Sequence, residues 1–202
     1  MTPLLQFVPL AGVAATPWKN GGGLTRDLLL WPPASGDEWQ LRISVAEVAQ
    51  SGPFSAYPGV ARWFCVLQGA GVVLHLPTGQ QQGKYTLTPD SPPLHFDGAQ
   101  APGCELLEGP TLDLNLMARQ TAGRAEMGRA VAGVPWASRA PLRALFTLNG
   151  ATLCREGAAP VQVPPATLAY TGLTAAASAG EGWELAQTGD SGWWLAFKPH
   201  AR

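Results

Sequence analysis

Glycine and proline recur along the whole chain and separate short runs that are either apolar or alternate between apolar and polar residues. The 202 residues include 24 glycines and 19 prolines, spread along the sequence rather than gathered in one low-complexity block. Both residue types favour turns and interrupt helices, so the segments between them are kept short. Short strands joined by turns are typical of a β-sandwich or barrel, and we therefore predict an all-β fold.

Two runs in the first half alternate with the period of two that a strand requires. In residues 39–46 the apolar side chains of Trp39, Leu41, Ile43 and Val45 alternate with Gln40, Arg42 and Ser44. In residues 111–116 leucines at 112, 114 and 116 alternate with Thr111, Asp113 and Asn115. The run 62–67 is continuously apolar after its arginine, which predicts a central strand that is buried on both faces.

The second half supplies further strand candidates at residues 142–148, 152–155, 161–163, 167–171 and 193–198. The best helix candidate is residues 119–131. The stretch 119–141 is rich in glycine, alanine and arginine and poor in strand signals. We therefore expect a lobe at 1–118 and a second β lobe at 119–202.

Charge and apolar patterning exclude several classes of protein. Charged residues make up 13% of the chain and the net charge is −1, whereas a nucleic-acid binder needs clustered Lys and Arg. No stretch reaches the roughly 20 apolar residues that span a bilayer. Residues 1–10 lack the basic and apolar regions of a signal peptide, so we expect a cytoplasmic protein. Cys65, Cys104 and Cys154 show no metal spacing and no paired framework, which favours reduced thiols.

A glycine-rich loop stands out near the N-terminus. Residues 17–26 read Pro-Trp-Lys-Asn-Gly-Gly-Gly-Leu-Thr-Arg, so three glycines are bracketed by an indole, a lysine, an amide and an arginine. Glycine permits backbone dihedrals that other residues avoid, and such a turn can present polar groups beside an aromatic wall. A flexible hairpin loop with solvated charges fits the residue types equally well.

Catalytic and metal-binding signatures are sparse. Ser44, Ser51 and Ser55 lie outside any Gly-x-Ser-x-Gly elbow, which argues against a serine hydrolase. A three-ligand metal site assembled from His75, His95 and Asp97 is conceivable by residue type, but isolated histidines in strands are more often structural. We expect no metal and no cofactor.

A polar set remains whose members share the ability to hold an anion and fix its orientation: Lys19, Asn20, Arg26, Arg42, Ser44, Arg62, Asp113 and Asn115. Arginine clamps carboxylates, and Trp18, Phe54 and Trp63 could supply an apolar wall. If these polar faces point inward, they form a pocket for a small anionic, partly planar molecule. If they point outward, they form the solvent-exposed face of a β-sandwich, which is the commoner arrangement.

Several motifs, in order and approximate spacing, resemble those of the HutD/Ves family. They are residues 17–23 with Thr25 and Arg26, residues 39–46, residues 51–55 with Tyr57, Pro58, Gly59 and Arg62, residues 96–98, and residues 113–117. The chain departs from the family pattern at Arg119-Gln120, where relatives carry two arginines, and in the Trp39–Ser44 strand, where relatives often read Trp-Arg-Leu-Ser. Residues beyond 120 fit only by length and by β character.

The resemblance implies a cupin-type (RmlC-like) β-barrel with two barrel-like halves in one chain. The HutD group is associated with bacterial histidine utilisation, with urocanate or a formylated relative as the suggested ligand. The Ves group is associated with stress response. The family lacks the metal-binding histidines of other cupins and carries no established reaction. The resemblance also favours inward-facing Arg42, Ser44, Asp113 and Asn115, with Asp113 paired to an arginine because an unpartnered buried arginine is costly.

Our leading hypothesis is a non-enzymatic cupin that binds a small carboxylate and regulates histidine utilisation. The binding residues would be Trp18, Lys19, Asn20, Arg26, Arg42, Ser44, Phe54, Arg62, Asp113 and Asn115. A metal-independent isomerase or hydrolase that uses Asp97 or Asp113 with His95 is the second hypothesis. A protein-binding adaptor, whose eight tryptophans form an exposed patch, is the third. A homodimer is left open, and no nucleic-acid or membrane partner is expected.

Overall fold

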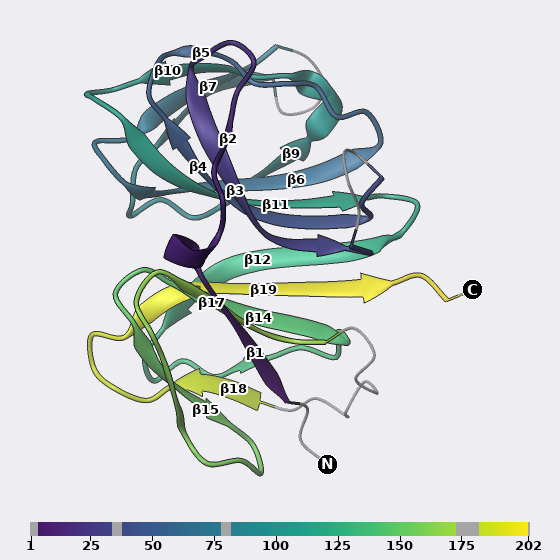
Figure 1. Cartoon of the computed structure of the whole chain (residues 1–202), viewed down its shortest axis with the longest axis vertical. Helices are drawn as coiled ribbons and strands as arrows, with labels where there is room; N and C mark the ends of the chain where they lie inside the picture. Colours follow the sequence, from purple (N-terminus) through teal and green to yellow (C-terminus); the bar gives the residue numbers. More distant parts are fainter. Residues whose placement is uncertain (1–3, 34–37, 78–81, 173–181, 202) are drawn as a thin grey trace. The chain divides into compact units, whose positions relative to one another are not determined.

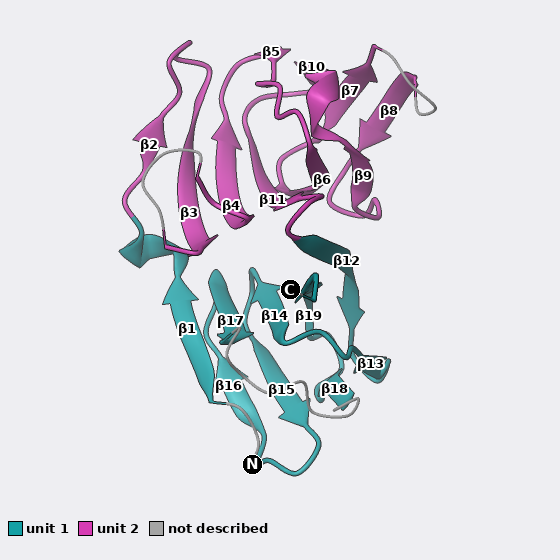
Figure 2. Ribbon diagram, turned by 90° about the vertical axis from the view of Figure 1, so that its right-hand side faces the viewer, with its two compact units in different colours: residues 1–13, 123–202 teal, residues 14–122 magenta. Residues whose placement is uncertain are grey.

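The computed structural model describes residues 4–33, 38–77, 82–172 and 182–201. These residues form two compact units, one made of residues 14–122 (unit 2) and the other of residues 1–13 and 123–202 (unit 1) (Figure 2). Helical structure in the described residues is limited to two short 3-10 turns, η1 (Leu10–Gly12) and η2 (Gly98–Gln100). The prediction of an all-β fold is confirmed. No helix in these ranges is long and apolar enough to cross a bilayer.

Unit 2 contains two antiparallel sheets (Figure 1). The six-stranded sheet has the order β2 (Thr16–Pro17), β3 (Gly23–Trp31), β4 (Leu41–Val48), β11 (Thr111–Arg119), β6 (Val60–Gln68) and β9 (Leu94–Asp97). The four-stranded sheet has the order β5 (Gly52–Pro53), β10 (Gly103–Leu106), β7 (Val72–Leu76) and β8 (Gly83–Leu87). In the described residues the two sheets do not join into one closed barrel, so the predicted cupin-type barrel takes the form of a two-sheet β-sandwich.

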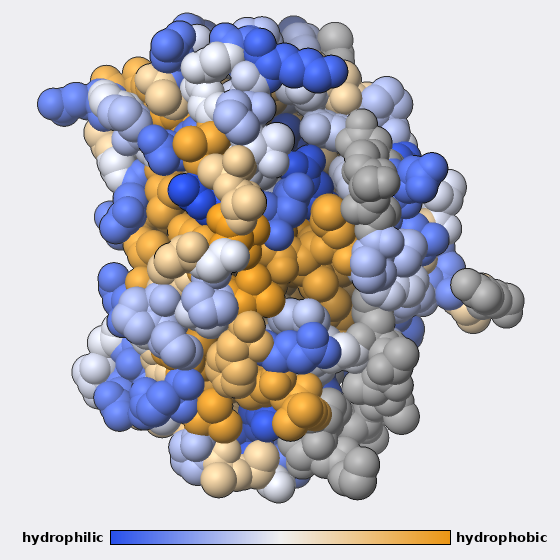
Figure 3. Space-filling model, in the orientation of Figure 1, coloured by the Kyte–Doolittle hydropathy of each residue, from blue (hydrophilic) through white to orange (hydrophobic). Residues whose placement is uncertain are grey.

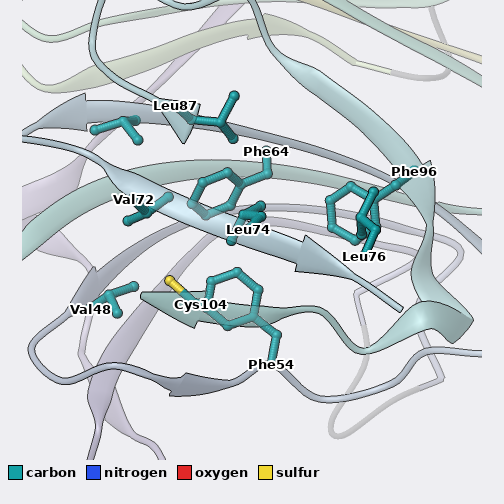
Figure 4. Packing of buried hydrophobic residues seen from close by; sticks show 10 residues of the cluster. Val48, Phe54, Phe64, Val72, Leu74, Leu76, Leu87, Phe96 and Cys104 are labelled. Carbon is teal, nitrogen blue, oxygen red and sulfur yellow. The ribbon is translucent and has the colours of Figure 1, made fainter. Parts of the chain in front are cut away.

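An apolar cluster contributed by strands of both sheets forms the core of unit 2 (Figure 4). Its buried members are Val48, Phe54, Phe64, Val66, Val72, Leu74, Leu76, Leu87, Phe96 and Cys104. Val72, Leu74 and Leu76 are alternate residues of β7, so a period of two delivers one face of that strand to the core. Burial of these side chains fixes the register of both sheets, because a slip by one residue would expose them.

Unit 1 repeats the two-sheet plan. Its five-stranded sheet has the order β1 (Leu5–Pro9), β17 (Thr167–Thr171), β14 (Leu142–Thr147), β19 (Ser191–Pro199) and β12 (Gly123–Val131). Its four-stranded sheet has the order β13 (Trp136–Ala137), β18 (Gly182–Leu185), β15 (Ala151–Arg155) and β16 (Val161–Val163). Trp183 and Trp194 lie in its core, with ring centroids 6.1 Å apart. The five strand candidates of the second half therefore all correspond to strands.

The N-terminal strand belongs to a different unit from the one expected. A division at residue 118 assigns residues 1–13 to the N-terminal lobe, but β1 pairs with β17 over five residues, from Leu5 opposite Thr171 to Pro9 opposite Thr167. The chain starts in unit 1, builds all of unit 2, and re-enters unit 1 at residue 123. The re-entry point falls in the 119–141 stretch that lacked strand signals.

The helix expected at residues 119–131 is wrong. Residues 119 and 123–131 lie in strands, and β12 pairs antiparallel with β19 from Gly123 opposite Pro199 to Val131 opposite Ser191. Alanine, glutamate, methionine and arginine favour helices in isolation, but Gly123 and Gly128 weaken that preference. A nine-residue partner strand supplies backbone hydrogen bonds that outweigh the local propensity.

Candidate functional site

Unit 2 encloses a cavity of about 650 Å³ against the six-stranded sheet. Its floor is made of alternate residues of three neighbouring strands, namely Arg42, Ser44 and Ala46 of β4, Val60 and Arg62 of β6, and Asn115, Met117 and Arg119 of β11. Its walls come from the glycine-rich loop and from residues 53–58, which begin at the last residue of β5. The volume falls within the range of small-molecule sites in proteins.

The polar face of β4 points inward rather than to solvent. Arg42 and Ser44 line the cavity, while Leu41 and Ile43 on the opposite face are fully buried. Asn115 lies opposite Ser44 in the register of β11 and β4, and opposite Phe64 in the register of β11 and β6. The same pairing that aligns the strands therefore brings the polar side chains of β4, β6 and β11 onto one surface.

The glycine-rich loop is held by its own backbone. Gly21 adopts a φ of +70°, and the Gly22 amide donates to the Asn20 side chain at 3.0 Å. A Cβ on Gly23 would collide with the backbone oxygen of Glu47 and would crowd the Trp18 ring. The sequence Gly-Gly-Gly thus lets the loop turn tightly and approach β4, which places Trp18, Lys19 and Asn20 at the cavity.

Arg62 is the central cation of the cavity. Its side chain is 7% exposed, and its Nε and Nη2 atoms donate to Oδ1 of Asn115 at 3.0 and 2.7 Å. The guanidinium lies 4.8 Å from the ring centroid of Phe54 and 5.5 Å from that of Phe96. Burial lowers the pKa of Arg62 to about 10, so the group stays cationic at neutral pH. Within the described residues, no carboxylate oxygen forms an ion pair with it.

Arg42, by contrast, already has a carboxylate partner. Its Nε donates to Oδ1 of Asp27 at 2.7 Å. Burial would lower the pKa of Arg42, but the hydrogen bond and charge of Asp27, with a smaller contribution from Tyr57, raise it above the usual value. The two cavity arginines therefore differ: Arg42 is neutralised by an acid, and Arg62 is held only by a neutral amide.

Aromatic rings form the apolar part of the wall. Trp18 meets Phe54 edge to face at a centroid distance of 6.1 Å, and its Nε1 donates to Oγ1 of Thr25 at 2.8 Å. Tyr57 also lines the cavity, and its side chain acts to raise the pKa of both Arg42 and Arg62. A flat ligand can stack on such rings while an anionic end reaches the floor.

Asp113 lies on the same face of β11 as Asn115 but outside the cavity lining. It is 0% exposed, and its Oδ2 accepts from Oγ1 of Thr111 at 2.8 Å while Oδ1 has no hydrogen-bond partner. Burial raises the pKa of Asp113 to about 7, although the Thr111 hydroxyl and the charge of Arg62 act in the opposite direction. The expected ion pair between Asp113 and an arginine is therefore not formed.

Eight of the ten predicted binding residues meet at the cavity: Trp18, Lys19, Asn20, Arg42, Ser44, Phe54, Arg62 and Asn115. Arg26 and Asp113 do not line it. Arg26 is adjacent in β3 to Thr25 and Asp27, which both face the cavity, so alternation points Arg26 to the other side. The cavity is also lined by Asp27, Tyr57 and Arg119, which the sequence pattern did not indicate as binding residues. Alternation carried the signal for Arg119, since Asn115, Met117 and Arg119 share one face of β11.

The alternative catalytic and metal sets are not assembled. Among the described residues, no three His, Cys, Asp or Glu side chains come together to hold a metal, and so His75, His95 and Asp97 do not form a site. His95 stacks on Trp63 at a centroid distance of 4.2 Å. Trp63 and His95 alternate with Arg62 and Phe96 along β6 and β9, which puts them on the face away from the cavity. His95 is therefore not beside Asp113, and Trp63 is not part of the wall.

Comparisons with known proteins agree with these motifs. The family model HutD matches residues 11–186. The chain is 32% identical over 124 residues to protein Ves of Citrobacter koseri, a match that covers 61% of this chain and 62% of Ves. It is 36% identical over 118 residues to an uncharacterized 21.2 kDa protein in the hutC 3' region of Pseudomonas putida, covering 56% of this chain and 57% of that protein. The matches thus span less than two thirds of the length of these curated relatives.

Solved structures give the same result for the fold. HutD from Pseudomonas fluorescens SBW25, in a structure described as its formate condition, matches with a TM-score of 0.81 at 22% identity. The match covers 98% of this chain and 100% of that one. The two chains therefore share a fold over their whole length.

Proposed function

The chain belongs to the HutD family, and on that premise we propose that it is a non-enzymatic protein that binds a small carboxylate in the cavity of unit 2. Family membership and the likeness to a protein from the hutC 3' region associate it with histidine utilisation. The ligand class would be a carboxylate from histidine breakdown, and urocanate and N-formyl-L-glutamate are the first compounds to test. The protein would act as a sensor or regulator in that pathway.

One observation carries the proposal: Arg62 is a buried cation without a carboxylate counter-ion in the described part of the chain. Burying an unpaired charge costs several kcal/mol, roughly, and an anionic ligand removes that cost. Asn115 orients the guanidinium by accepting hydrogen bonds from Nε and Nη2 of Arg62. The other N–H groups of the guanidinium can donate to a ligand.

The charge balance of the cavity points the same way. Its lining includes four cationic side chains, Lys19, Arg42, Arg62 and Arg119, and one carboxylate, Asp27. A surplus of positive charge in a concave site raises the local concentration of anions. The aromatic wall of Trp18, Phe54 and Tyr57 suits a carboxylate with a planar portion.

The adaptor hypothesis has less support, because none of the eight tryptophans is an exposed side chain and all eight lie in the described ranges. On the face drawn in Figure 3 hydrophobic residues gather toward the middle, and hydrophilic residues lie mainly toward the edges. In the described ranges the exposed large apolar side chains are Leu4, Phe7, Leu107, Val131 and Val134. The enzyme hypothesis loses its acid–base pair, since His95 faces away from the cavity.

A cytoplasmic location and a homodimer are further proposals. Cys65, Cys104 and Cys154, which all lie in the described ranges, form no disulfide, as is usual in a reducing compartment. Size-exclusion chromatography with light scattering would report the oligomeric state of the full chain.

A thermal-shift screen tests the proposed function. Chelator-treated protein would be melted with formate, urocanate, N-formyl-L-glutamate, histidine and divalent metals. A ligand at 100 times its Kd stabilises the native state by about 2.7 kcal/mol, which is a measurable rise in Tm. We expect a selective response to a carboxylate that is lost in Arg62→Gln and kept in Arg124→Gln, an exposed arginine of unit 1. A response to metal alone, or no response to any carboxylate, contradicts the proposal.

A further inference from the structure

Within the part of the chain that the structure describes, Asp113 is the fully buried carboxyl group next to the cavity, and the proposed function does not use it. It is 0% exposed, it is two residues from Asn115 on the same face of β11, and its Oδ1 atom has no hydrogen-bond partner. A buried polar atom without a partner needs a physical explanation, because it costs free energy in either ionisation state. A carboxyl that changes its protonation state during function supplies one.

The charged and titratable neighbours of Asp113 are few. On β6 the neighbour is Arg62, whose charge favours the ionised carboxylate, and on β10 it is the Cys104 thiol. On β11 itself Thr111 donates one hydrogen bond to the carboxyl. The residues directly opposite Asp113 on the adjacent strands are Ala46 of β4 and Val66 of β6, which carry no charge. Among the described residues, Arg62 is thus the cation whose charge acts on Asp113.

Arg62 and Asp113 stabilise each other's charges without touching. Each raises the fraction of the other that is ionised, since the charge of Arg62 lowers the pKa of Asp113 and the charge of Asp113 raises that of Arg62. The guanidinium is bonded to Asn115 instead, so Asp113 contributes only through space. Anything that neutralises Arg62 therefore removes the main electrostatic support for a charged Asp113.

We propose that binding of an anion at Arg62 is coupled to uptake of one proton from solvent by the carboxyl group of Asp113. The coupling rests on the proposed function, because it assumes that the anion docks on Arg62. The added proton offsets one negative charge of the anion that enters. In this role Asp113 changes the charge near Arg62 and does not touch the ligand.

The coupling predicts the pH dependence of binding. In the free protein the pKa of Asp113 is about 7, and a bound anion raises it further. Below that pH the carboxyl is protonated with or without ligand, so affinity is constant. Above it, affinity falls by about tenfold per pH unit until the pKa of the complex is passed. Arg62 stays charged throughout this window because its pKa is about 10.

Calorimetry in buffers of different ionisation enthalpy measures the proton directly. The probe is N-formyl-L-glutamate, whose carboxylates stay ionised from pH 6 to 9, so that any proton taken up belongs to the protein. We expect uptake of about half a proton at pH 7 that approaches one at pH 8. Asp113→Asn should bind with an affinity that does not vary with pH and without uptake, and Asp90→Asn, an exposed carboxylate, should behave as wild type. Binding of the wild type without uptake overturns the inference.

A ligand-free measurement separates this inference from the proposed function. Carbon-13 NMR of the Asp113 carboxyl follows its titration in the wild type and in Arg62→Gln. This substitution removes the positive charge that a bound anion would neutralise. The midpoint should rise in Arg62→Gln, and it should rise also in Thr111→Val, which removes the hydrogen bond to the carboxylate. If no carboxylate binds, the proposed function fails while this comparison still tests the coupling. Thr111→Val is the positive control, and an unchanged midpoint in Arg62→Gln contradicts the coupling.

Discussion

Replacing Asp113 by asparagine should stabilise the free protein at alkaline pH more than at acidic pH. The native state raises the pKa of Asp113 from 3.8 to about 7, chiefly because the carboxyl is buried. The native state therefore binds the proton more tightly than the unfolded chain does. The stability that this group contributes is fully present below pH 3.8 and is lost as the pH rises through about 7. Asparagine cannot ionise, so the variant escapes this loss.

The size of the effect follows from the pKa shift. One pKa unit corresponds to about 1.4 kcal/mol. From pH 5 up to the native pKa of about 7, the native state keeps the Asp113 proton while the unfolded chain has lost it. The native state therefore loses relative stability over about two pH units of the range from pH 5 to pH 8. The free energy of unfolding of Asp113→Asn, minus that of the wild type, should therefore increase by about 2.5 kcal/mol over this range. Thr111 can still donate to the side-chain oxygen of an asparagine, so the fold should tolerate the change.

Urea denaturation followed by tryptophan fluorescence provides the assay. Four of the tryptophans, Trp18, Trp31, Trp39 and Trp63, lie in unit 2, so its transition can be followed. Asp90→Asn serves as the control, because an exposed carboxylate should give the same stability difference at both pH values. A stability difference for Asp113→Asn that is equal at pH 5 and pH 8 would refute the argument that burial controls this carboxyl.

Three further predictions concern the cavity and its loop. Asn115→Leu leaves the buried Arg62 guanidinium without its acceptor and should lower the free energy of unfolding by about 3 kcal/mol in urea denaturation. Gly23→Ala forces a methyl group against a backbone carbonyl of β4 and should cost about 1–3 kcal/mol in the same assay. Asp27→Asn frees Arg42 from its ion pair and should tighten carboxylate binding by about two- to fivefold in calorimetry.

The two stability predictions have matched controls. Gly128→Ala adds a methyl group where the structure leaves open space, so it should be close to neutral if crowding is what destabilises Gly23→Ala. An exposed asparagine, Asn149, can be replaced by leucine to show that losing an amide is not costly by itself. Weaker carboxylate binding in Asp27→Asn would mean that Asp27 holds Arg42 in place rather than competing with the ligand.

Much of the strand pattern could be predicted because alternation and burial act locally. The runs at 39–46 and 111–116 become β4 and β11, and their registers place Ser44 opposite Asn115. The error at residues 119–131 has a different origin, since β12 owes its conformation to pairing with β19, which lies more than 60 residues later. A short window contains no information about such a distant partner. The same holds for β1, whose partner β17 is at residues 167–171.

The site was harder to predict than the strands. Alternation separates the two faces of a strand but does not say which face lines a cavity, so Arg42 and Ser44 could have faced solvent. The prediction that Asp113 pairs with an arginine used the rule that buried charges are paired, yet the structure satisfies Arg62 with a neutral amide. That choice depends on distances between side chains of β6 and β11, which sequence spacing does not give.

The most direct test of the account is the calorimetric titration of N-formyl-L-glutamate, urocanate and formate into wild-type protein and into Arg62→Gln. The account predicts saturable binding of at least one carboxylate to the wild type, with affinity reduced by at least tenfold in Arg62→Gln, since a charge-assisted hydrogen bond is worth about 1.5–3 kcal/mol. Equal affinity for the two proteins would show that the buried arginine is not the anion receptor and would contradict the central claim.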